Sequence, residues 1–392
     1  MRRLSANYII PVDKKPLKNG IVEIDDDGKI INLIDTGGDL TESQSLEFYN
    51  GVIVPGFINT HCHLELSGFK NKIPTQTGLP NFIKHVVDLK RNNKQIDFKA
   101  IELYDSLMRS NGIVAVGDIC NTNDTLRTKN RSKIHYYNFI EAIGLGKASD
   151  IFKYNQELET QFKQEKFSTS IVPHAPYSVS QELFDLIKLE AQAKNTVLTI
   201  HNQESADENQ MFVNKTGNLV NQLQAIGVDL KNWESSGKSS IHTIIDLLPR
   251  DNNILFVHNL FSSIDDLNTI SRKIKNSFFC LCPLSNLYIQ NKLPDLKLFL
   301  NYTNQITLGT DSMASNKSLS ILDEIKALSL NFDYVRFVDS IKWATLNGAK
   351  ALKIDDKFGS ITKGKYPRLN LITNFDFEKM QVTGNSQVQV LI

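Results

Sequence analysis

The sequence predicts an α/β protein in which eight β/α units form a (β/α)8 barrel of the TIM type, joined to a small β-sandwich domain made from both chain ends. Three observations support this prediction. Eight short apolar runs recur along the chain, polar segments with helical periodicity separate them, and the two ends read instead as short strands joined by turns. Eight alternating strand and helix units over about 250 residues are typical of this barrel.

The predicted strands are apolar runs that end in turn or polar residues. They cover residues 52–65, 112–120, 134–143, 169–178, 196–204, 253–260, 277–286 and 305–312. Each gap has room for a crossover helix, as in SQELFDLIKLEAQAKN, where apolar residues recur at helical spacing after Ser180, a residue suited to a helix N-cap. An open doubly wound sheet is the alternative, but it normally carries a glycine-rich phosphate loop after its first strand, and this sequence has none.

The two chain ends are predicted to pair with each other. Residues 1–50 carry turn signals at 18–20 and 26–28, and residues 357–392 have the same short-strand character. Neither segment alone could cover its own strand edges, which favours one domain built from both. The expected division is therefore a composite β-sandwich domain of residues 1–50 and 357–392, and a barrel of residues 51–356.

Charge and hydropathy limit the classes of partner. The chain has 44 basic and 43 acidic residues, so no overall field would gather nucleic acid or anionic lipid, and a small-molecule substrate is expected. No apolar run approaches the roughly 20 residues that span a bilayer. The N-terminal apolar stretch is interrupted by Asn7 and Pro11 and no small-residue cleavage site follows, which indicates a cytoplasmic protein.

The four cysteines do not form the dense framework of a small secreted protein. Cys280 and Cys282 alternate within the apolar run FFCLCP, where a C-x-C metal site is the alternative to two small core residues. We favour core packing, because free cysteine packs like a small hydrophobic residue. Cys62 lies between two histidines and is expected to point away from whatever they bind.

Polar residues collect where the predicted strands end. Five of the eight histidines lie at or near such an end, and Asp311 ends the eighth strand. Side chains at the carboxyl ends of barrel strands converge on one face, where barrel active sites are built. His61 and His63 form an H-x-H pair whose two imidazoles share one strand face. With His201, which ends TVLTIH, and Asp311 they suit one Zn2+ ion, with Fe2+ as the alternative, and leave a position for water.

Other strand-end residues have both a catalytic and a structural interpretation. Glu204 follows His201 by three residues and could be a proton shuttle or a first-turn residue of the next helix. His258 ends NILFVH and His174 lies in VPHAPYS. Each alone could be a buried structural histidine, but both lie at strand ends on the same face as the other candidates, which favours a role in the site. The remaining histidines, which lie within helical segments or at strand starts, receive no catalytic role; they are His85, His135 and His242.

Taken together, the motifs resemble the amidohydrolase superfamily, specifically its cytosine-deaminase and chlorohydrolase-like branch. They occur in the order GVIVPGFINTHCHLE, IVPHAPYS, TIHNQES, VHN, CPLSN and LGTDSMASN, and span nearly the whole chain. The terminal stretch FGSITKGKYPRLNLI is similar to the family's closing segment, although Tyr-Pro-Arg-Leu-Asn stands where Ala-Asp-Leu is common. The stretch after the first strand, HLELSGFKNKIPTQTGLPNFI, is also similar to that of deaminases of adenine-bearing nucleosides such as aminodeoxyfutalosine.

The resemblance implies a role for each candidate residue. His61, His63, His201 and Asp311 would hold one metal ion, since the fourth strand offers no lysine that could bridge two. Glu204 would move protons, and His258, with Asp311, would accept the proton of the attacking water and orient it. The implied substrate contacts are His174 and Asn286, the last residue of CPLSN. A homodimer is also expected from the family.

The implied reaction is hydrolytic deamination of an amino-substituted N-heterocycle, most simply a purine nucleoside or base. Water activated by the metal would attack the ring carbon, and ammonia would leave. Three alternatives stay open at this point: a hydrolase of cyclic amides or other carbon–nitrogen bonds that resembles imidazolonepropionase, a triazine chlorohydrolase, and a metal-binding protein without turnover. Loops after the strands decide among substrates, and loop sequences do not reveal which heterocycle is bound.

Overall fold

The computed structural model describes residues 1–41, 45–92, 95–303 and 305–392. Within this part of the chain, strands form three sheets: two parallel sheets of four strands and one mixed sheet of seven. Helices alternate with the strands of the two parallel sheets. The protein therefore has the predicted α/β class with parallel strands.

The two parallel sheets contain strands consecutive in sequence. Their orders are β6-β7-β8-β9 and β10-β11-β12-β13. The bounds are β6 (Phe57–Cys62), β7 (Ile113–Cys120), β8 (His135–Ala142), β9 (Ser168–Pro173), β10 (Leu198–Asn202), β11 (Asn253–His258), β12 (Asn276–Leu281) and β13 (Ile306–Leu308). Each of these lies within one residue of, or inside, a predicted range. Long apolar runs thus form strands buried on both faces, as parallel sheets require.

Several predicted strands are longer than the observed ones; for example, β9 ends at Pro173 and β13 at Leu308. Residues 52–65 divide between β5 (Leu46–Pro55), which belongs to the mixed sheet, and β6. Residues 277–286 form β12 only as far as Leu281, because helix α10 (Pro283–Gln290) begins at a proline, which has no amide hydrogen to donate to a sheet and suits the first helical turn. Asn286 therefore lies on a helix and not at a strand end.

Backbone hydrogen bonds join the two parallel sheets at both pairs of edges. The amide of His201 donates to the carbonyl of His174 at 2.9 Å. On the other side, the amides of Thr310 and Asp311 both donate to the carbonyl of His61 at 3.0 Å. These contacts lie at the carboxyl ends of the strands, so the candidate residues of both sheets are brought to one place.

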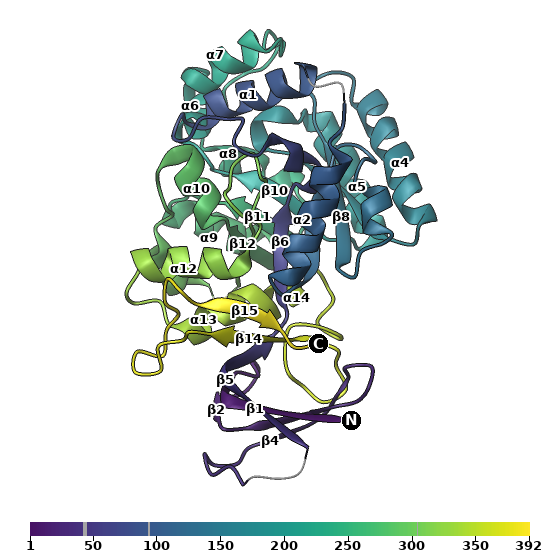
Figure 1. Ribbon diagram of the computed structural model, residues 1–392. Helices are drawn as coiled ribbons and strands as arrows, with labels where there is room; N and C mark the ends of the chain where they lie inside the picture. Colours follow the sequence, from purple (N-terminus) through teal and green to yellow (C-terminus); the bar gives the residue numbers. More distant parts are fainter. Residues whose placement is uncertain (42–44, 93–94, 304) are drawn as a thin grey trace.

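Helices follow the strands and cover the two parallel sheets. They are α1 (Leu79–Asn92), α2 (Phe98–Ser110), α3 (Leu126–Lys129), α4 (Ala148–Gln164), α5 (Gln181–Lys194), α6 (Ala206–Asn214), α7 (Asn218–Ala225), α8 (Ser240–Ile244), α9 (Ile264–Lys273), α10, α11 (Leu296–Tyr302), α12 (Ile321–Asn331), α13 (Phe337–Lys342) and α14 (Gly348–Ala351). Figure 1 shows α1, α6 and α7 beyond one end of the parallel strands and the mixed sheet at the other. No described helix is long and apolar enough to cross a membrane.

The mixed sheet contains strands from both chain ends, which lie near each other in Figure 1. Its order is β15-β14-β5-β1-β3-β4, with β2 paired to β1. The bounds are β1 (Arg2–Ile9), β2 (Leu17–Lys18), β3 (Ile21–Ile24), β4 (Ile30–Ile34), β5, β14 (Leu369–Thr373) and β15 (Gln387–Val390). β14 pairs antiparallel with β5, so the last strands of the chain do pair with the first ones.

Cysteines contribute to the core. All four are free and buried. Cys280 lies on β12 and Cys282 just beyond it, both with no exposed surface. This agrees with their interpretation as small core residues.

Gly112 lies where the parallel and mixed sheets meet. Its carbonyl accepts hydrogen bonds from the amide of Phe57 and from Nδ2 of Asn370, both at 2.9 Å. Gly112 has a φ of +79°, and a Cβ there would lie 2.3 Å from Asn370 Nδ2. The junction therefore requires glycine for two reasons, backbone conformation and space.

We predict that Gly112→Ala lowers the free energy of unfolding by about 3 kcal/mol, from left-handed backbone strain and overpacking together. Gly37→Ala is the matched control, because Gly37 has a φ of +66° but nothing within 4 Å of an added Cβ. The control should lose only about 1 kcal/mol. Urea denaturation of both variants measures the difference, and equal losses would contradict the steric argument.

Candidate active site

The strand ends bring the predicted ligand residues together. His61 lies on β6, His63 directly follows it, His201 lies on β10 and Asp311 follows β13. The Nε2 atoms of His61 and His63 are 3.2 Å apart. Asp311 Oδ1 lies 3.8 Å from the first of these atoms and 3.5 Å from the second. Residues separated by up to 250 positions thus share one small volume.

His201 and His258 complete the cluster. The ring centroid of His61 lies 4.9 Å from that of His201 and 5.8 Å from that of His258. Ligand atoms of these three histidines lie within 4.8 Å of one another, as do those of His61, His63 and Asp311. Two overlapping sets of nitrogen and oxygen donors therefore surround the same point.

Hydrogen bonds set the orientation of the outer imidazoles. His201 Nδ1 lies 2.8 Å from the carbonyl oxygen of His174. A carbonyl oxygen only accepts, so Nδ1 carries the hydrogen and Nε2 keeps its lone pair. His258 Nδ1 is 2.9 Å from Asn286 Oδ1, which fixes the second ring in the same way. Imidazoles held by a hydrogen bond at one nitrogen are typical of metal ligands and of general bases.

Asp311 is held as an ionised carboxylate. Its Oδ2 accepts hydrogen bonds from the hydroxyls of Ser285 at 2.7 Å and Ser315 at 2.6 Å. Burial opposes ionisation, but the facing His63 and His258 and the two hydroxyls together lower the pKa of Asp311. Oδ1 is left facing the histidine pair. Asp311 therefore presents one charged oxygen to the cluster.

Burial keeps three histidines of the cluster, His61, His63 and His258, neutral. Burial lowers the pKa of His61 well below its usual value and that of His63 to about 4. Burial likewise lowers the pKa of His258. Neutral imidazole is the form that binds a metal ion, so the site needs no deprotonation step to accept one.

The backbone is strained at two of these positions. His258 has a φ of +70° and Asp311 a φ of +56°. Left-handed backbone is unfavourable for non-glycine residues by about 1–3 kcal/mol each and persists only where the surroundings enforce it. The strain turns both side chains at the ends of their strands toward the cluster, a pattern that is common at functional sites.

Glu204 lies beside the cluster and lines the pocket above it. Its Oε1 is 3.7 Å from His258 Nε2. Burial raises the pKa of Glu204 to about 8, so the carboxyl group holds a proton near neutral pH. Helix α6 begins at Ala206 and Ser205 is its N-cap, so the structural interpretation of Glu204 as a helix N-cap or first-turn residue is excluded.

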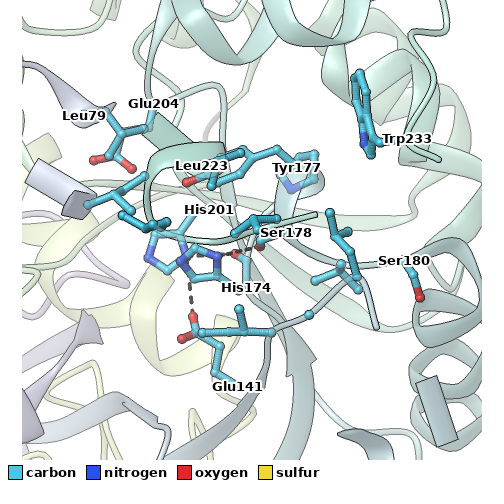
Figure 2. Close-up of a pocket in the computed structure, with 18 of the residues that line it drawn as sticks. Leu79, Glu141, His174, Tyr177, Ser178, Ser180, His201, Glu204, Leu223 and Trp233 are labelled. Atoms are coloured by element: carbon cyan, nitrogen blue, oxygen red, sulfur yellow. Dashed lines mark hydrogen bonds and ion pairs between the residues drawn. The ribbon is translucent and has the colours of Figure 1, made fainter. Parts of the chain in front are cut away.

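A cavity of about 1240 Å3 opens over the cluster. Its lining includes His63, His174, His201, Glu204 and Asp311, and continues into an apolar wall formed by Leu79, Phe82, Ile83, Val86, Leu223, Ile226 and Trp233. Figure 2 shows Trp233 and Ser180 on the side of the pocket away from Glu204 and His201. The cavity can therefore enclose a molecule much larger than the reacting group.

Several predicted residues lie elsewhere. Asn286 is buried against His258 and is not among the residues that line this cavity; its role as a substrate contact stays a prediction. His85, His135 and His242 also lie outside the lining. His135 lies against Phe358 at the start of β8, which agrees with giving it no catalytic role.

The sequence analysis missed three polar residues that line the pocket, Lys90, Asn121 and Glu141, and Glu65, whose carboxylate accepts hydrogen bonds from Lys90 and Asn121. Glu141 lies near the carboxyl end of β8, so the strand-end rule that found the histidines could have found it. Lys90 lies in the last turn of α1, and its side chain lines the pocket. No local pattern in the sequence distinguishes it from other helical lysines.

Comparison with known families decides the class of protein. A model of the amidohydrolase family matches residues 52–390, which includes every residue of the cluster. The chain belongs to the amidohydrolase family. The predicted enzyme class, a hydrolase of carbon–nitrogen bonds other than peptide bonds, is confirmed by this membership.

Individual amidohydrolases resemble the chain over most of their length. A protein of Methanococcus maripaludis named 5'-deoxyadenosine deaminase is 28% identical over 362 residues, covering 83% of this chain and 75% of its own. A Helicobacter pylori protein named adenosine deaminase is 29% identical, covering 85% of this chain and 82% of its own. The crystal structure of Helicobacter pylori aminofutalosine deaminase with methylthio-coformycin superposes with a TM-score of 0.82 at 25% identity, covering 97% of this chain and 94% of that one.

A buried ion pair supports the metal-facing turn of this amidohydrolase. Asp118 on β7 accepts a hydrogen bond from the amide of Leu64, the residue after His63, at 2.9 Å. Its other oxygen lies 2.5 Å from Lys129 Nζ, and neither side chain has exposed surface. Lys129 also donates to Asn138 Oδ1 at 2.7 Å. The pair therefore anchors the chain where it leaves β6.

We predict that Lys129→Met lowers the free energy of unfolding by about 3–5 kcal/mol, because Asp118 is left as an unpaired buried carboxylate. The double variant Asp118→Asn, Lys129→Met should lose less, since the amide still accepts from Leu64 and carries no charge. Thermal and urea unfolding of the two proteins measure this difference. A double variant less stable than the single one would show that the charge is not the cause.

Proposed function

We propose that this amidohydrolase is a metal-dependent hydrolytic deaminase of purine nucleosides. The observation that carries the proposal is the meeting of His61, His63, His201 and Asp311 beneath a large pocket that also contains Glu204. The curated relatives named as deaminases of 5'-deoxyadenosine and adenosine support the substrate class. A cyclic-amide hydrolase would release a carboxylate and a triazine chlorohydrolase would release chloride, so the products distinguish the alternatives.

We further infer that the two parallel sheets close into one eight-stranded barrel. The hydrogen bonds from His201 to His174 and from Thr310 and Asp311 to His61 support closure at both edges. Residues 51–356 would form this barrel. Residues 1–50 and 357–392 would form the β-sandwich domain around the mixed sheet. The homodimer and the cytoplasmic location stay predictions.

The donor set fits one divalent ion. Three imidazoles and one carboxylate suit Zn2+, and they also suit Fe2+. The close approach of the His61 and His63 Nε2 atoms, 3.2 Å apart, favours a shared ligand between two lone pairs. His61 Nδ1 has no hydrogen-bond partner among the described residues. When bound, the ion supplies Lewis acidity that lets water lose a proton near neutral pH.

The remaining roles follow from protonation and position. Glu204, which holds its proton near pH 7, would donate it to a ring nitrogen as the neighbouring carbon is attacked. As a carboxylate it would then take the proton of the added hydroxyl group and pass it to the amine, which leaves as ammonia when the C–N bond breaks. The proton taken from the attacking water would return to Glu204 and complete the cycle. Neutral His258 and ionised Asp311 would accept and orient the proton of the attacking water. Asn286 would keep His258 in the required tautomer. His174, which is half-buried and lines the pocket, would contact the heterocycle.

We predict that Glu204→Gln lowers kcat/KM for ammonia release from 5'-deoxyadenosine by about 100- to 10,000-fold, because an amide cannot transfer the proton. Metal content and the thermal midpoint should stay near those of the unmodified protein. Glu102→Gln, an exposed change on α2, is the matched control. Equal activity in the Glu204 and Glu102 variants would exclude Glu204 from the chemistry. Release of a carboxylate or chloride from the alternative substrates, with no ammonia from nucleosides, would exclude deamination.

The serine hydroxyls that donate to Asp311, those of Ser285 and Ser315, lead to a prediction about metal affinity. Ser315→Ala removes one of them and should weaken Zn2+ binding by about 10- to 100-fold, as loss of a ligand's supporting hydrogen bond does in other metal sites. Ser318→Ala is the control, because that hydroxyl donates to Asp323 instead. Competition with a chromogenic chelator measures both affinities. Unchanged affinity in the Ser315 variant would contradict the role of Asp311 as a ligand.

A further inference from the structure

A connected set of four polar residues that the proposed chemistry does not use borders the pocket, and three of them line it. We call Glu65, Lys90, Asn121 and Glu141 the polar wall. Lys90 Nζ donates to Glu65 Oε1 at 3.0 Å and to Asn121 Oδ1 at 3.2 Å. The amide of Asn121 donates to Glu65 Oε2 at 2.9 Å, and Asn121 Nδ2 donates to Glu141 Oε2 at 2.8 Å. The polar wall therefore comes from the ends of three neighbouring strands and from α1.

One oxygen of the polar wall lacks a donor. Glu141 is 5% exposed, and within the described chain no hydrogen bond reaches its Oε1. His201 Nδ1 lies 3.7 Å from this oxygen and directs its hydrogen to the carbonyl of His174. Figure 2 shows the Glu141 carboxylate beside the rings of His174 and His201. Glu141 lines the cavity, so this carboxylate oxygen is open to a hydrogen-bond donor from a bound molecule.

Lys90 complements this acceptor. Its ammonium group has three donors, and Glu65 and Asn121 take two of them. Lys90, Asn121 and Glu141 all line the cavity. The wall thus presents one free acceptor and one free donor, joined through the side chain of Asn121. A pair of neighbouring hydroxyl groups matches this arrangement, because each hydroxyl can donate and accept.

We propose that the polar wall binds the vicinal hydroxyl groups of the substrate's sugar, with Glu141 Oε1 accepting from one hydroxyl and Lys90 donating to the other. This inference rests on the proposed function and extends it: the substrate is a ribonucleoside with both ring hydroxyls free, and not a free base or a deoxyribonucleoside. The apolar wall by Trp233 is then left to the opposite end of the substrate. Glu141 and Lys90 determine specificity without taking part in proton transfer.

The test combines a substrate series with enzyme variants. For the unmodified, metal-loaded protein, kcat/KM for 5'-deoxyadenosine should exceed that for 2',5'-dideoxyadenosine and 3',5'-dideoxyadenosine by about 10- to 100-fold, the range of a hydrogen bond to a charged group. Glu141→Gln should lower kcat/KM for 5'-deoxyadenosine. It should have little effect on the dideoxy substrate that lacks the hydroxyl bound by Glu141, because that substrate has already lost the contact. Lys90→Met should likewise have little effect on the other dideoxy substrate, which lacks the hydroxyl bound by Lys90. Glu157→Gln, exposed on α4, is the matched control.

Several results would overturn the inference. One is the same fold loss for Glu141→Gln on all three nucleosides, and another is equal use of the dideoxy substrates by the unmodified protein. A third is a second bound metal per chain that Glu141→Gln removes, because Glu141, His174 and His201 also have ligand atoms within 4.8 Å of one another. If the Glu141→Gln protein does not fold, two other measurements decide the question. One is kcat/KM of Lys90→Met on the three nucleosides. The other compares inhibition of the unmodified protein by 5'-deoxyinosine, which has both hydroxyls, with inhibition by hypoxanthine, which has no sugar. Absence of ammonia from every nucleoside would instead refute the proposed function.

Discussion

The arrangement of the whole molecule depends on one constraint: four imidazoles and a carboxylate must lie side by side out of water. Isolated polar groups pay a large desolvation penalty, so such a cluster persists only where hydrogen bonds and a rigid frame hold each member. Parallel strands provide that frame, because their carboxyl ends meet at one face. His61, His201, His258 and Asp311 come from or directly follow strands of both parallel sheets, and backbone hydrogen bonds between the sheets run through three of them.

The supporting groups show how the cost of this cluster is distributed. Asn286 and the carbonyl of His174 fix the outer imidazoles, while Ser285 and Ser315 hold Asp311. The left-handed backbone at His258 and Asp311 stores further strain. Each of these groups would be a defect in a purely structural core. Together they leave lone pairs directed at one point, which is what a metal site requires.

The pocket above the cluster divides into two chemically different parts. The apolar wall that includes Phe82 and Trp233 can bury a ring or an alkyl group, whereas the polar wall offers paired hydrogen-bonding groups. Glu204 stands next to the cluster and is kept protonated by burial. A nucleoside has the same division, with a flat base, a sugar diol and a variable substituent. The match between these parts explains why a cavity of about 1240 Å3 is useful in an enzyme that changes a single bond.

Strand periodicity and the position of histidines determined much of this protein from the sequence alone. The eight parallel strands follow from local patterns. The candidate ligand residues and Glu204 could be proposed from the same patterns, because the carboxyl ends of the strands in this kind of fold meet at one face. Local patterns could not separate β5 from β6, since the apolar run is continuous and only the partner sheets differ. Nor could they show that Asn286 supports His258, or that Lys90 on α1 meets Glu141 on β8. Those relations join residues distant in sequence through packing, and only the tertiary structure decides them.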